Sequence, residues 1–322
     1  MSRLVRPAAM RSVPGLAALP DEPLVVTVGV FDGLHRGHRR VVAATVAEAH
    51  ARGALATVVS FEPHPDAVLR GAPPPLLCDP PERDACLAEL GVELLVRQRF
   101  DRTFADRTAT SFVDELTGRD RRLRALVMTH ESAFGRGREG NARTLPPLAA
   151  RLGFAILEVP ALFVGGQRVS DSRIRALVTA GRLADAAHLL GRRYAVVGEV
   201  TRGDGRGREL GFPTANLAFA APVTLPPDGI YAVRAGWGGP DPRHPAHVAS
   251  GVASLGVRPT FGGGERILEA HLFDVGPDLY GRRLRVEFVR RQRGERRFGT
   301  AAALIAQMER DATRAREILA TT

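Results

Sequence analysis

The stretch VVTVGVFDGLHRGHRRVV, residues 25–42, decides the fold of the first half of the chain. Val25 to Val30 is rich in β-branched residues and predicts a buried strand, and the glycines that follow predict a turn before a helix. Such a turn presents unpaired backbone amides and the positive end of the helix dipole, which together bind phosphate. His35 and His38 lie on one helical turn, so both rings can reach the same phosphate oxygens. The pattern predicts nucleotidyl-transfer chemistry.

Two other interpretations of this histidine pair stay open. Histidines beside a turn are common as surface residues, and together with Asp32 they have a spacing that suits metal ligands. No third strong ligand lies nearby in the sequence, which disfavours the metal.

The composition is that of an ordinary globular protein with room for two domains. The chain has 322 residues, of which 44% are hydrophobic and 25% are charged. No apolar run approaches the length of a membrane span, which excludes a transmembrane segment. The only cysteines, Cys78 and Cys86, are too few for a disulfide framework. We therefore expect a reducing compartment, the cytoplasm.

The charge balance is basic, because 45 arginines oppose 35 acidic residues and give a net charge of +10. Such a surplus raises the question of nucleic acid. The arginines are spread along the chain, however, without the interleaved aromatic residues that stack on bases. Small phosphate-rich substrates explain the charge equally well, so we expect neither a nucleic-acid nor a membrane partner. The oligomeric state is left open, and a homo-oligomer is allowed.

Strand-like runs alternate with amphipathic segments over the first half of the chain, which predicts parallel strands with crossover helices. Residues 1–22 are expected to be a short flexible lead-in, since prolines interrupt any helix there. The expected strands are Leu24–Val30, Ala54–Phe61, Glu93–Val96, Ala125–Met128 and Ala155–Val159, and the expected helices are Arg39–Ala51 and Pro81–Leu90. Ligands of such sheets bind beyond the carboxyl ends of the strands, where the histidine turn lies.

A different pattern begins after Leu190, where we place the domain boundary at the end of a helix that starts at Leu183. Short strand-like runs are separated there by glycine, proline and aspartate, which predicts a compact antiparallel barrel. The runs are Tyr194–Val200, Gly229–Ala235, His247–Gly256, Ile267–Asp274 and Leu284–Arg290. Thr300–Leu319 predicts one amphipathic helix at the end.

The barrel region carries a second motif, GDGRGRELGFPTANL, residues 203–217. Its glycines let the backbone approach a polyphosphate closely. Thr214 and Asn216 are oxygen ligands two residues apart, which suits Mg²⁺ beside bound phosphates. Glu269 alternates with apolar residues in a predicted strand, so its carboxylate projects from one face and suits a general base acting on a hydroxyl. A solvent-facing glutamate is the alternative.

Taken together, the motifs resemble the bacterial family of bifunctional riboflavin kinases and FMN adenylyltransferases, also called FAD synthetases, along nearly the whole chain. The matching segments are GVFDGLHRGH at 29–38, SFEPHP at 60–65, FGRGREGN at 134–141, SDSRIR at 170–175, GDGRGRELGFPTANL at 203–217, GVRPTF at 256–261 and LEAHLFD at 268–274. The resemblance implies an α/β fold, with a Rossmann-like HxGH nucleotidyltransferase domain over residues 23–190. It also implies a six-stranded antiparallel riboflavin kinase barrel with a closing helix over 191–322.

The same resemblance implies a role for individual residues. Riboflavin would be phosphorylated to FMN with MgATP, with Glu269 as base and Mg²⁺ at Thr214 and Asn216. FMN would then take a nucleotidyl group from ATP, with His35 and His38 stabilising the transition state and pyrophosphate leaving towards Arg173. The other nucleotide contacts fall on Gly29, Phe31, Asp32, Gly37, Thr129, Glu131, Ser170, Asp171, Ser172, Gly203, Gly205, Arg206, Gly207, Gly211 and Pro213. The flavin contacts fall on Phe61, His64, Pro65 and Arg258.

The chain departs from the family pattern at two places in the first half. Thr129, Glu131 and Ser132 stand where the family has a glycine, a shorter acid and an aromatic residue, which makes the nucleobase pocket atypical. Asp171 puts a negative charge where triphosphate oxygens are expected. Three outcomes stay open for this half: it uses ATP, it uses CTP and makes a flavin cytidine dinucleotide, or it is inactive. A non-catalytic flavin-binding or regulatory protein is a more remote alternative.

Overall fold

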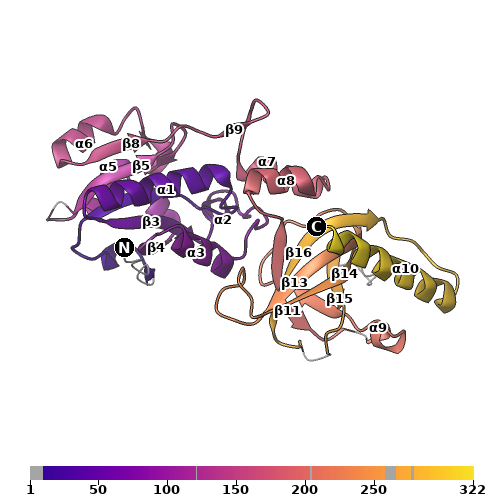
Figure 1. Ribbon diagram of the computed structural model, residues 1–322. Coiled ribbons are helices and arrows are strands. Elements are labelled where there is room, and N and C mark those ends of the chain that lie inside the picture. The colour runs from indigo at the N-terminus through magenta and orange to yellow at the C-terminus, as the bar shows by residue number, and fades with distance from the viewer. Residues whose placement is uncertain (1–9, 121, 204, 258–265, 277–278) are drawn as a thin grey trace, which may run out of the picture. The chain divides into compact units, whose positions relative to one another are not determined.

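The structure is a computed structural model that describes residues 10–120, 122–203, 205–257, 266–276 and 279–322. The chain forms two compact units (Figure 1). The first contains Met1–Pro74 and Arg83–Ser170, and the second contains Pro75–Glu82 and Asp171–Thr322.

These units divide the chain earlier than the boundary that we placed at Leu190. Helices α7 (Asp171–Thr179) and α8 (Leu183–Leu190) pack on each other, and α8 also contacts the barrel strand β16 (Arg283–Arg293). The short segment from Pro75 joins the same unit, because Leu76 forms a parallel bridge with Val223. Helical periodicity shows where α7 and α8 begin and end, but not which neighbour they pack against.

The first unit is built on a six-stranded parallel sheet with the strand order β1-β4-β3-β2-β5-β8. The strands are β1 (Arg11–Val13), β2 (Leu24–Val28), β3 (Leu55–Glu62), β4 (Leu94–Arg99), β5 (Leu123–Met128) and β8 (Ala155–Glu158). All five strands expected from the sequence are present. Their sequences are continuous apolar runs because helices cover both faces of a parallel sheet.

The described part of the expected lead-in is not loose, which corrects our prediction of a flexible segment. Arg11–Val13 forms the edge strand β1 and pairs in parallel with β4. Leu16, in the short 3₁₀ helix η1 (Leu16–Ala18), is buried in the main core. A three-residue strand carries no periodic signal of its own, and its pairing with β4 is a long-range contact that local sequence does not show.

Helices cover both faces of this sheet. Val41 and Val42 of α1 (Arg36–Ala51) and Leu87 of α3 (Pro80–Glu89) pack against one face. Phe112 of α5 (Ala109–Thr117) and Ala149 of α6 (Pro146–Leu152) pack against the other. The smaller elements are α2 (Pro65–Leu69), α4 (Arg102–Ala105), η2 (Arg136–Arg138), the strand pair β6 (Ala133–Phe134) and β7 (Gly140–Asn141), and the strand pair β9 (Phe163–Val164) and β10 (Gln167–Arg168).

The second unit contains a closed antiparallel barrel with the order β11-β12-β15-β14-β13-β16, which confirms the expected six-stranded barrel. Its other strands are β11 (Ala195–Thr201), β12 (Ala215–Ala218), β13 (Gly229–Trp237), β14 (His247–Val257) and β15 (Arg266–Leu272). The four-residue strand β12 lies inside the glycine motif and gave no strand signal. Between β11 and β12 lies the one-turn helix α9 (Arg206–Glu209).

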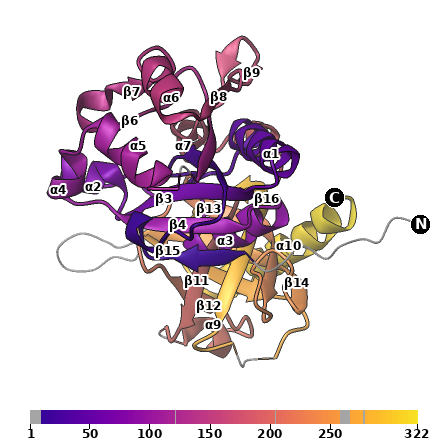
Figure 2. The same cartoon turned by 90° about the vertical axis from the view of Figure 1, so that its left-hand side faces the viewer.

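The last helix, α10 (Ala301–Ala320), lies along the barrel and contacts β13, β14 and β16 (Figure 2). It begins at Thr300, whose side chain accepts a hydrogen bond from the Ala303 amide as an N-cap. Ala312, Ala315 and Leu319 bury the amphipathic stripe, as the sequence predicts.

Candidate active sites

The turn after β2 is built around the histidine motif. His35 is the N-cap of α1, and its Nδ1 accepts a hydrogen bond of 3.0 Å from the His38 amide. The cap therefore satisfies one of the unpaired amides at the start of the helix and at the same time fixes the His35 ring. Phe31 and Leu34 have positive φ angles of 55° and 39°, a conformation that is unfavourable for bulky residues. Backbone strain at a buried turn of this kind is typical of functional sites.

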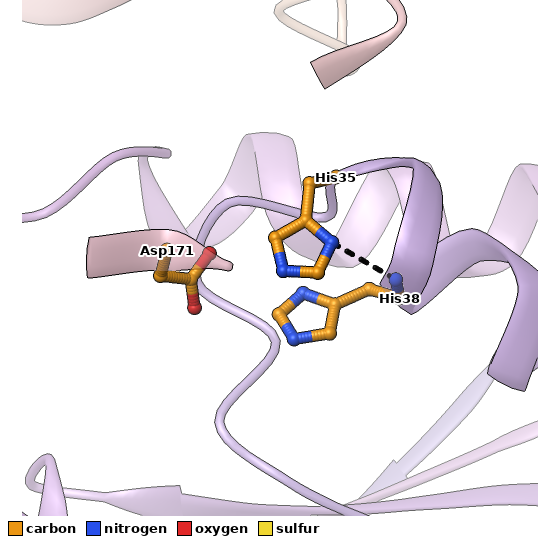
Figure 3. A group of neighbouring side chains, drawn as sticks. All are labelled: His35, His38 and Asp171. Carbon is orange, nitrogen blue, oxygen red and sulfur yellow. Dashed lines mark hydrogen bonds between the residues drawn. The ribbon is translucent and has the colours of Figure 1, made fainter. Parts of the chain in front are cut away.

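The two imidazole rings stack face to face, with centroids 3.7 Å apart and planes 16° from parallel (Figure 3). Gly37 makes this stack possible, because a Cβ there would lie 3.0 Å from His35 Cε1. His38 Nδ1 is buried and has no hydrogen-bond partner, and burial lowers the His38 pKa to about 3. His38 is therefore a neutral imidazole at physiological pH.

A cavity of about 250 Å³ opens beside His38, between the ends of β2 and β5. The strand order makes this the topological switch point of the sheet: the chain runs from β2 outward to β3 and β4, and then returns to the other side of β2 as β5. Open parallel sheets bind ligands at this point. The cavity is lined by Thr27, Val28, Gly29, Phe31, His38, Val41, Leu126, Val127, Met128, Thr129, Glu131, Ser132, Ala133, Phe134 and Arg138. The structure thus brings Thr129 and Glu131 to Gly29, Phe31 and His38, although the two segments are distant in sequence.

The segment that follows β5 forms one wall of this cavity and is internally hydrogen-bonded. The Ser132 hydroxyl accepts from the Thr129 amide at 3.0 Å and lies 2.9 Å from the Thr129 hydroxyl. Glu131 forms an ion pair with Arg168 of β10. The residues that depart from the family pattern therefore form a closed turn, and the acidic charge at the cavity is paired.

The remaining residues expected at the histidine site are divided between the histidine turn and helix α7. Asp32 is buried at 3% exposure within the turn itself. Ser170 ends the first unit, whereas Asp171, Ser172 and Arg173 form the first turn of α7 in the second unit. Their predicted contacts with triphosphate oxygens stay predictions.

The residues expected to contact flavin in this half follow β3, the neighbour of β2. The Phe61 ring packs against Phe100 and Phe104 in an aromatic cluster. His64 is the N-cap of α2, with Nδ1 accepting from the Asp66 amide at 3.1 Å, and Pro65 is the first residue of that helix. Phe61, His64 and Pro65 do not line the 250 Å³ cavity, so their flavin role stays a prediction. Arg258 lies outside the described residues.

A second cavity of about 400 Å³ lies in the second unit and contains the predicted kinase residues. Glu269 of β15 stands opposite Asn216 of β12 on one side and Ser254 of β14 on the other. Residues directly opposite one another on antiparallel strands lie with their Cβ atoms about 5 Å apart and face the same side. All three line the cavity, as does Thr214. Glu269 therefore lines the cavity, as strand alternation indicates, and its role as general base stays a prediction.

The glycine motif lies close to the two expected metal ligands. A Cβ at Gly203 would collide with the Asn216 amide, and a Cβ at Gly207 would lie 2.5 Å from the Phe212 carbonyl and 3.2 Å from the Thr214 hydroxyl. Neither position accepts a larger residue without a shift, because the Asn216 side chain lies against Gly203 and the Phe212 carbonyl lies against Gly207. The oxygens of Thr214 and Asn216 therefore fit a hard cation such as Mg²⁺ beside a phosphate-binding loop.

The other expected residues of the glycine motif differ in their position relative to the cavity. Gly205 lines the cavity, whereas Gly211, with φ of 84°, is not among its lining residues. The Pro213 carbonyl lies 2.9 Å from His271 Nδ1, which must carry the proton because a carbonyl only accepts. Of Arg206 the structure describes the backbone, as the first residue of α9.

Helix α10 also lines this cavity, with the apolar side chains of Leu304, Met308 and Ala312 and with Asp311. Arg293 of β16 pairs with the buried Asp311 of α10, with its Nε 3.0 Å from both carboxylate oxygens. Sequence reasoning missed this pair and Ser254. Ser254 could have been found from strand alternation, but nothing local links Arg293 to Asp311.

Within the described residues, no helix is both long and apolar enough to span a lipid bilayer.

Comparison with known protein families gives two matches that follow the two halves of the chain. The sequence model of the family described as "FAD synthetase" matches residues 18–173, and that described as "Riboflavin kinase" matches residues 190–319.

Characterised relatives match over almost the full length. The "Bifunctional riboflavin kinase/FMN adenylyltransferase" of Escherichia coli strain K12 is 37% identical over 314 residues, which cover 97% of this chain and 98% of that protein. The protein of the same name from Bacillus subtilis strain 168 is 33% identical and covers 89% of this chain and 90% of that protein. A solved structure titled as a macrolide-efflux protein from Streptococcus pneumoniae has a TM-score of 0.80 at 26% identity, covering 94% of this chain and 97% of that one.

Proposed function

The chain belongs to the family of bifunctional riboflavin kinases/FMN adenylyltransferases, and from this premise we propose that it converts riboflavin to FMN and FMN to FAD. The observation that carries the proposal is the strand register that places Glu269 beside Asn216 in a cavity rimmed by the glycine loop. This arrangement puts a carboxylate next to oxygen ligands for a metal and a loop for phosphates, which is what phosphoryl transfer to a hydroxyl requires.

In the barrel, Glu269 accepts the proton of the ribityl 5′-hydroxyl while that oxygen attacks the γ-phosphorus of ATP. A P–O bond forms to the ribityl oxygen, and the bond to the leaving ADP breaks. Mg²⁺, held by Thr214 and Asn216, would offset charge on the phosphate oxygens. The apolar side chains that α10 contributes to the cavity suit the flavin ring system, and the glycine loop with Gly205 and Gly207 suits the ATP phosphates.

In the first unit, a phosphate oxygen of FMN attacks the α-phosphorus of the nucleoside triphosphate, and pyrophosphate leaves with the bonding electrons. His38 is neutral, so it acts by donating a hydrogen bond to the transition state and not as a cation. Because Nδ1 is buried without a partner, we place the proton on Nε2. We expect pyrophosphate to leave towards Ser170, Ser172 and Arg173.

ATP is the nucleotide that we propose for this step, and CTP is the second candidate. The turn from Thr129 to Ser132 bonds to itself, and Glu131 pairs with Arg168. These polar groups already bond to protein groups. This favours a pocket that discriminates less between nucleobases than one with a hydrogen-bond acceptor reserved for the base.

One experiment separates the candidates. The purified chain is incubated with Mg²⁺ and each nucleoside triphosphate singly, once with riboflavin and once with supplied FMN, and the products are identified by mass. FAD with ATP supports the proposal. A cytidine dinucleotide with CTP supports the second candidate, and FMN alone means an inactive first unit. No product at all would favour a non-catalytic flavin-binding protein.

We further propose that residues 23–190 contain the nucleotidyl-transfer function and residues 191–322 the kinase function. A cytoplasmic location is supported by the cysteine content, because Cys78 and Cys86 are too few for a disulfide framework and suit a reducing compartment. A homo-oligomer and the absence of nucleic-acid binding stay predictions.

A further inference from the structure

We propose that Arg138 binds the phosphate group that is transferred in the first unit and supplies the positive charge that this cavity needs. Arg138 belongs to the segment FGRGREGN, residues 134–141, which our assignment of site residues did not use. The inference rests on the proposed nucleotidyl transfer and adds to it the residue that neutralises the reacting phosphate.

The charges around the cavity single out this residue. Among the described lining residues, Arg138 alone carries a permanent positive charge. The one acid, Glu131, is paired with Arg168, and burial keeps His38 neutral by lowering its pKa to about 3. Both substrates are anions, and their phosphates meet at the α-phosphorus, where the FMN oxygen attacks. A guanidinium binds phosphate oxygens with two parallel hydrogen bonds.

The loop that carries Arg138 is clamped onto the start of α5. A Cβ at Gly135 would lie 2.6 Å from the Ala109 nitrogen, and a Cβ at Gly140 would lie 2.6 Å from the Ala109 Cβ, so neither position accepts a larger residue without a shift. The Glu139 carboxylate accepts a hydrogen bond of 2.7 Å from the Ala109 amide, at the positive end of that helix. The loop backbone is therefore fixed on both sides of Arg138.

The clamp forces Arg138 into the left-handed region, with φ of 61°. Glycine would adopt this conformation without strain, yet an arginine stands here. The Cβ of any other residue causes strain at this φ, and strain that a glycine would remove points to a role for the side chain that stands here. The guanidinium is also held in place: its Nη2 donates to the Glu131 carbonyl at 3.0 Å, and the remaining N–H donors suit a phosphate.

The role follows from the bond changes of the transfer. As the FMN oxygen attacks the α-phosphorus and the bond to pyrophosphate breaks, negative charge grows on the equatorial oxygens. No proton is taken up by Arg138, which remains charged throughout and acts by attraction and hydrogen bonding alone.

The test compares Arg138→Ala, Arg138→Lys and Arg138→Gly in the full chain, with Arg136→Ala as the matched control from the same loop. We expect kcat/KM for dinucleotide formation from supplied FMN to fall about 100-fold in the alanine and glycine variants, and about 10-fold in the lysine variant. The melting temperature of Arg138→Gly should be no lower than that of wild type. The control and every variant should phosphorylate riboflavin at the wild-type rate.

Two results would overturn the inference. One is a rate within threefold of wild type in Arg138→Ala. The other is recovery of that rate in Arg138→Gly, which would mean that strain and not charge had caused the loss. If the wild type itself makes no dinucleotide, the proposed function fails, and calorimetric titration with ATP still tests Arg138. In that case, one of the two ATP sites must bind ATP at least fivefold more weakly in Arg138→Gly than in wild type, while the kinase site keeps its affinity. Equal ATP affinities in wild type and variant would refute the inference independently of the proposed function.

Discussion

The two cavities hold their polar groups in different ways. In the barrel, Glu269 stands between Asn216 and Ser254 on neighbouring strands, and ladder hydrogen bonds on both sides fix all three. In the first unit, His38 lies in the first turn of α1, where its ring contacts His35 and Phe31, and Arg138 lies in a loop, where its guanidinium donates to the Glu131 carbonyl. The barrel backbone therefore holds these side chains rigidly, and a substitution removes one polar group without moving the others. In the first unit the polar groups hold one another in place, so a substitution there also moves the neighbouring groups.

The largest effect should come from Glu269→Ala. We expect FMN formation to fall about 1,000-fold, because the ribityl hydroxyl loses its general base. Dinucleotide formation from supplied FMN should be unchanged, and so should the fold, since neighbouring strands hold the site. Phosphorylation is followed by separating FMN from riboflavin. Glu199→Ala, an exposed glutamate of β11 away from the cavity, is the control and should leave both rates unchanged. Undiminished phosphorylation in Glu269→Ala would remove this residue as the base.

The counterpart in the first unit is His38→Ala. Pyrophosphate release should fall about 100-fold because one hydrogen bond to the transition state is lost, while FMN continues to accumulate. The matched control is His50→Ala, an exposed histidine in the last turn of the same helix. A dinucleotide yield equal to that of wild type would take the histidine pair out of the mechanism.

Burial of His38 also predicts a pH dependence of stability that the barrel site does not share. Its pKa is about 3 in the folded chain against 6.5 in an exposed histidine, so the unfolded chain binds the proton more tightly between these values. Stability is therefore fully present above pH 6.5 and is lost as the pH falls. Between pH 7 and pH 5, wild type should lose about 2 kcal/mol more unfolding free energy than His38→Gln. Equal losses in denaturant titrations at the two pH values would show that His38 is not desolvated.

The same contrast explains how far the sequence could be interpreted. Strand alternation was enough to aim Glu269 into its cavity, because a strand has only two faces. Phe61 lies at the end of a correctly predicted strand, yet its ring packs into an aromatic cluster instead of the cavity. The pairing of Glu131 with Arg168 joins two turns that are far apart in sequence, and neither turn has a period that indicates the other. Sites on strands are thus predictable from local pattern, whereas sites on loops depend on contacts that only the fold brings about.

The smallest effect, and the finest test of this contrast, should come from Arg168→Ala. The change frees the Glu131 carboxylate at the edge of a cavity that receives anions, so the KM for the nucleoside triphosphate should rise about threefold. Both side chains are roughly half exposed, so the effect should shrink in 0.5 M salt, and kcat should hardly change. Adding Glu131→Gln to this variant removes the freed charge and should restore the KM, since repulsion and not lost structure is the cause. A KM that stays raised in the double variant would instead mean that the ion pair stabilises the turn at Thr129. Losing even an exposed ion pair would then shift neighbouring residues in this unit.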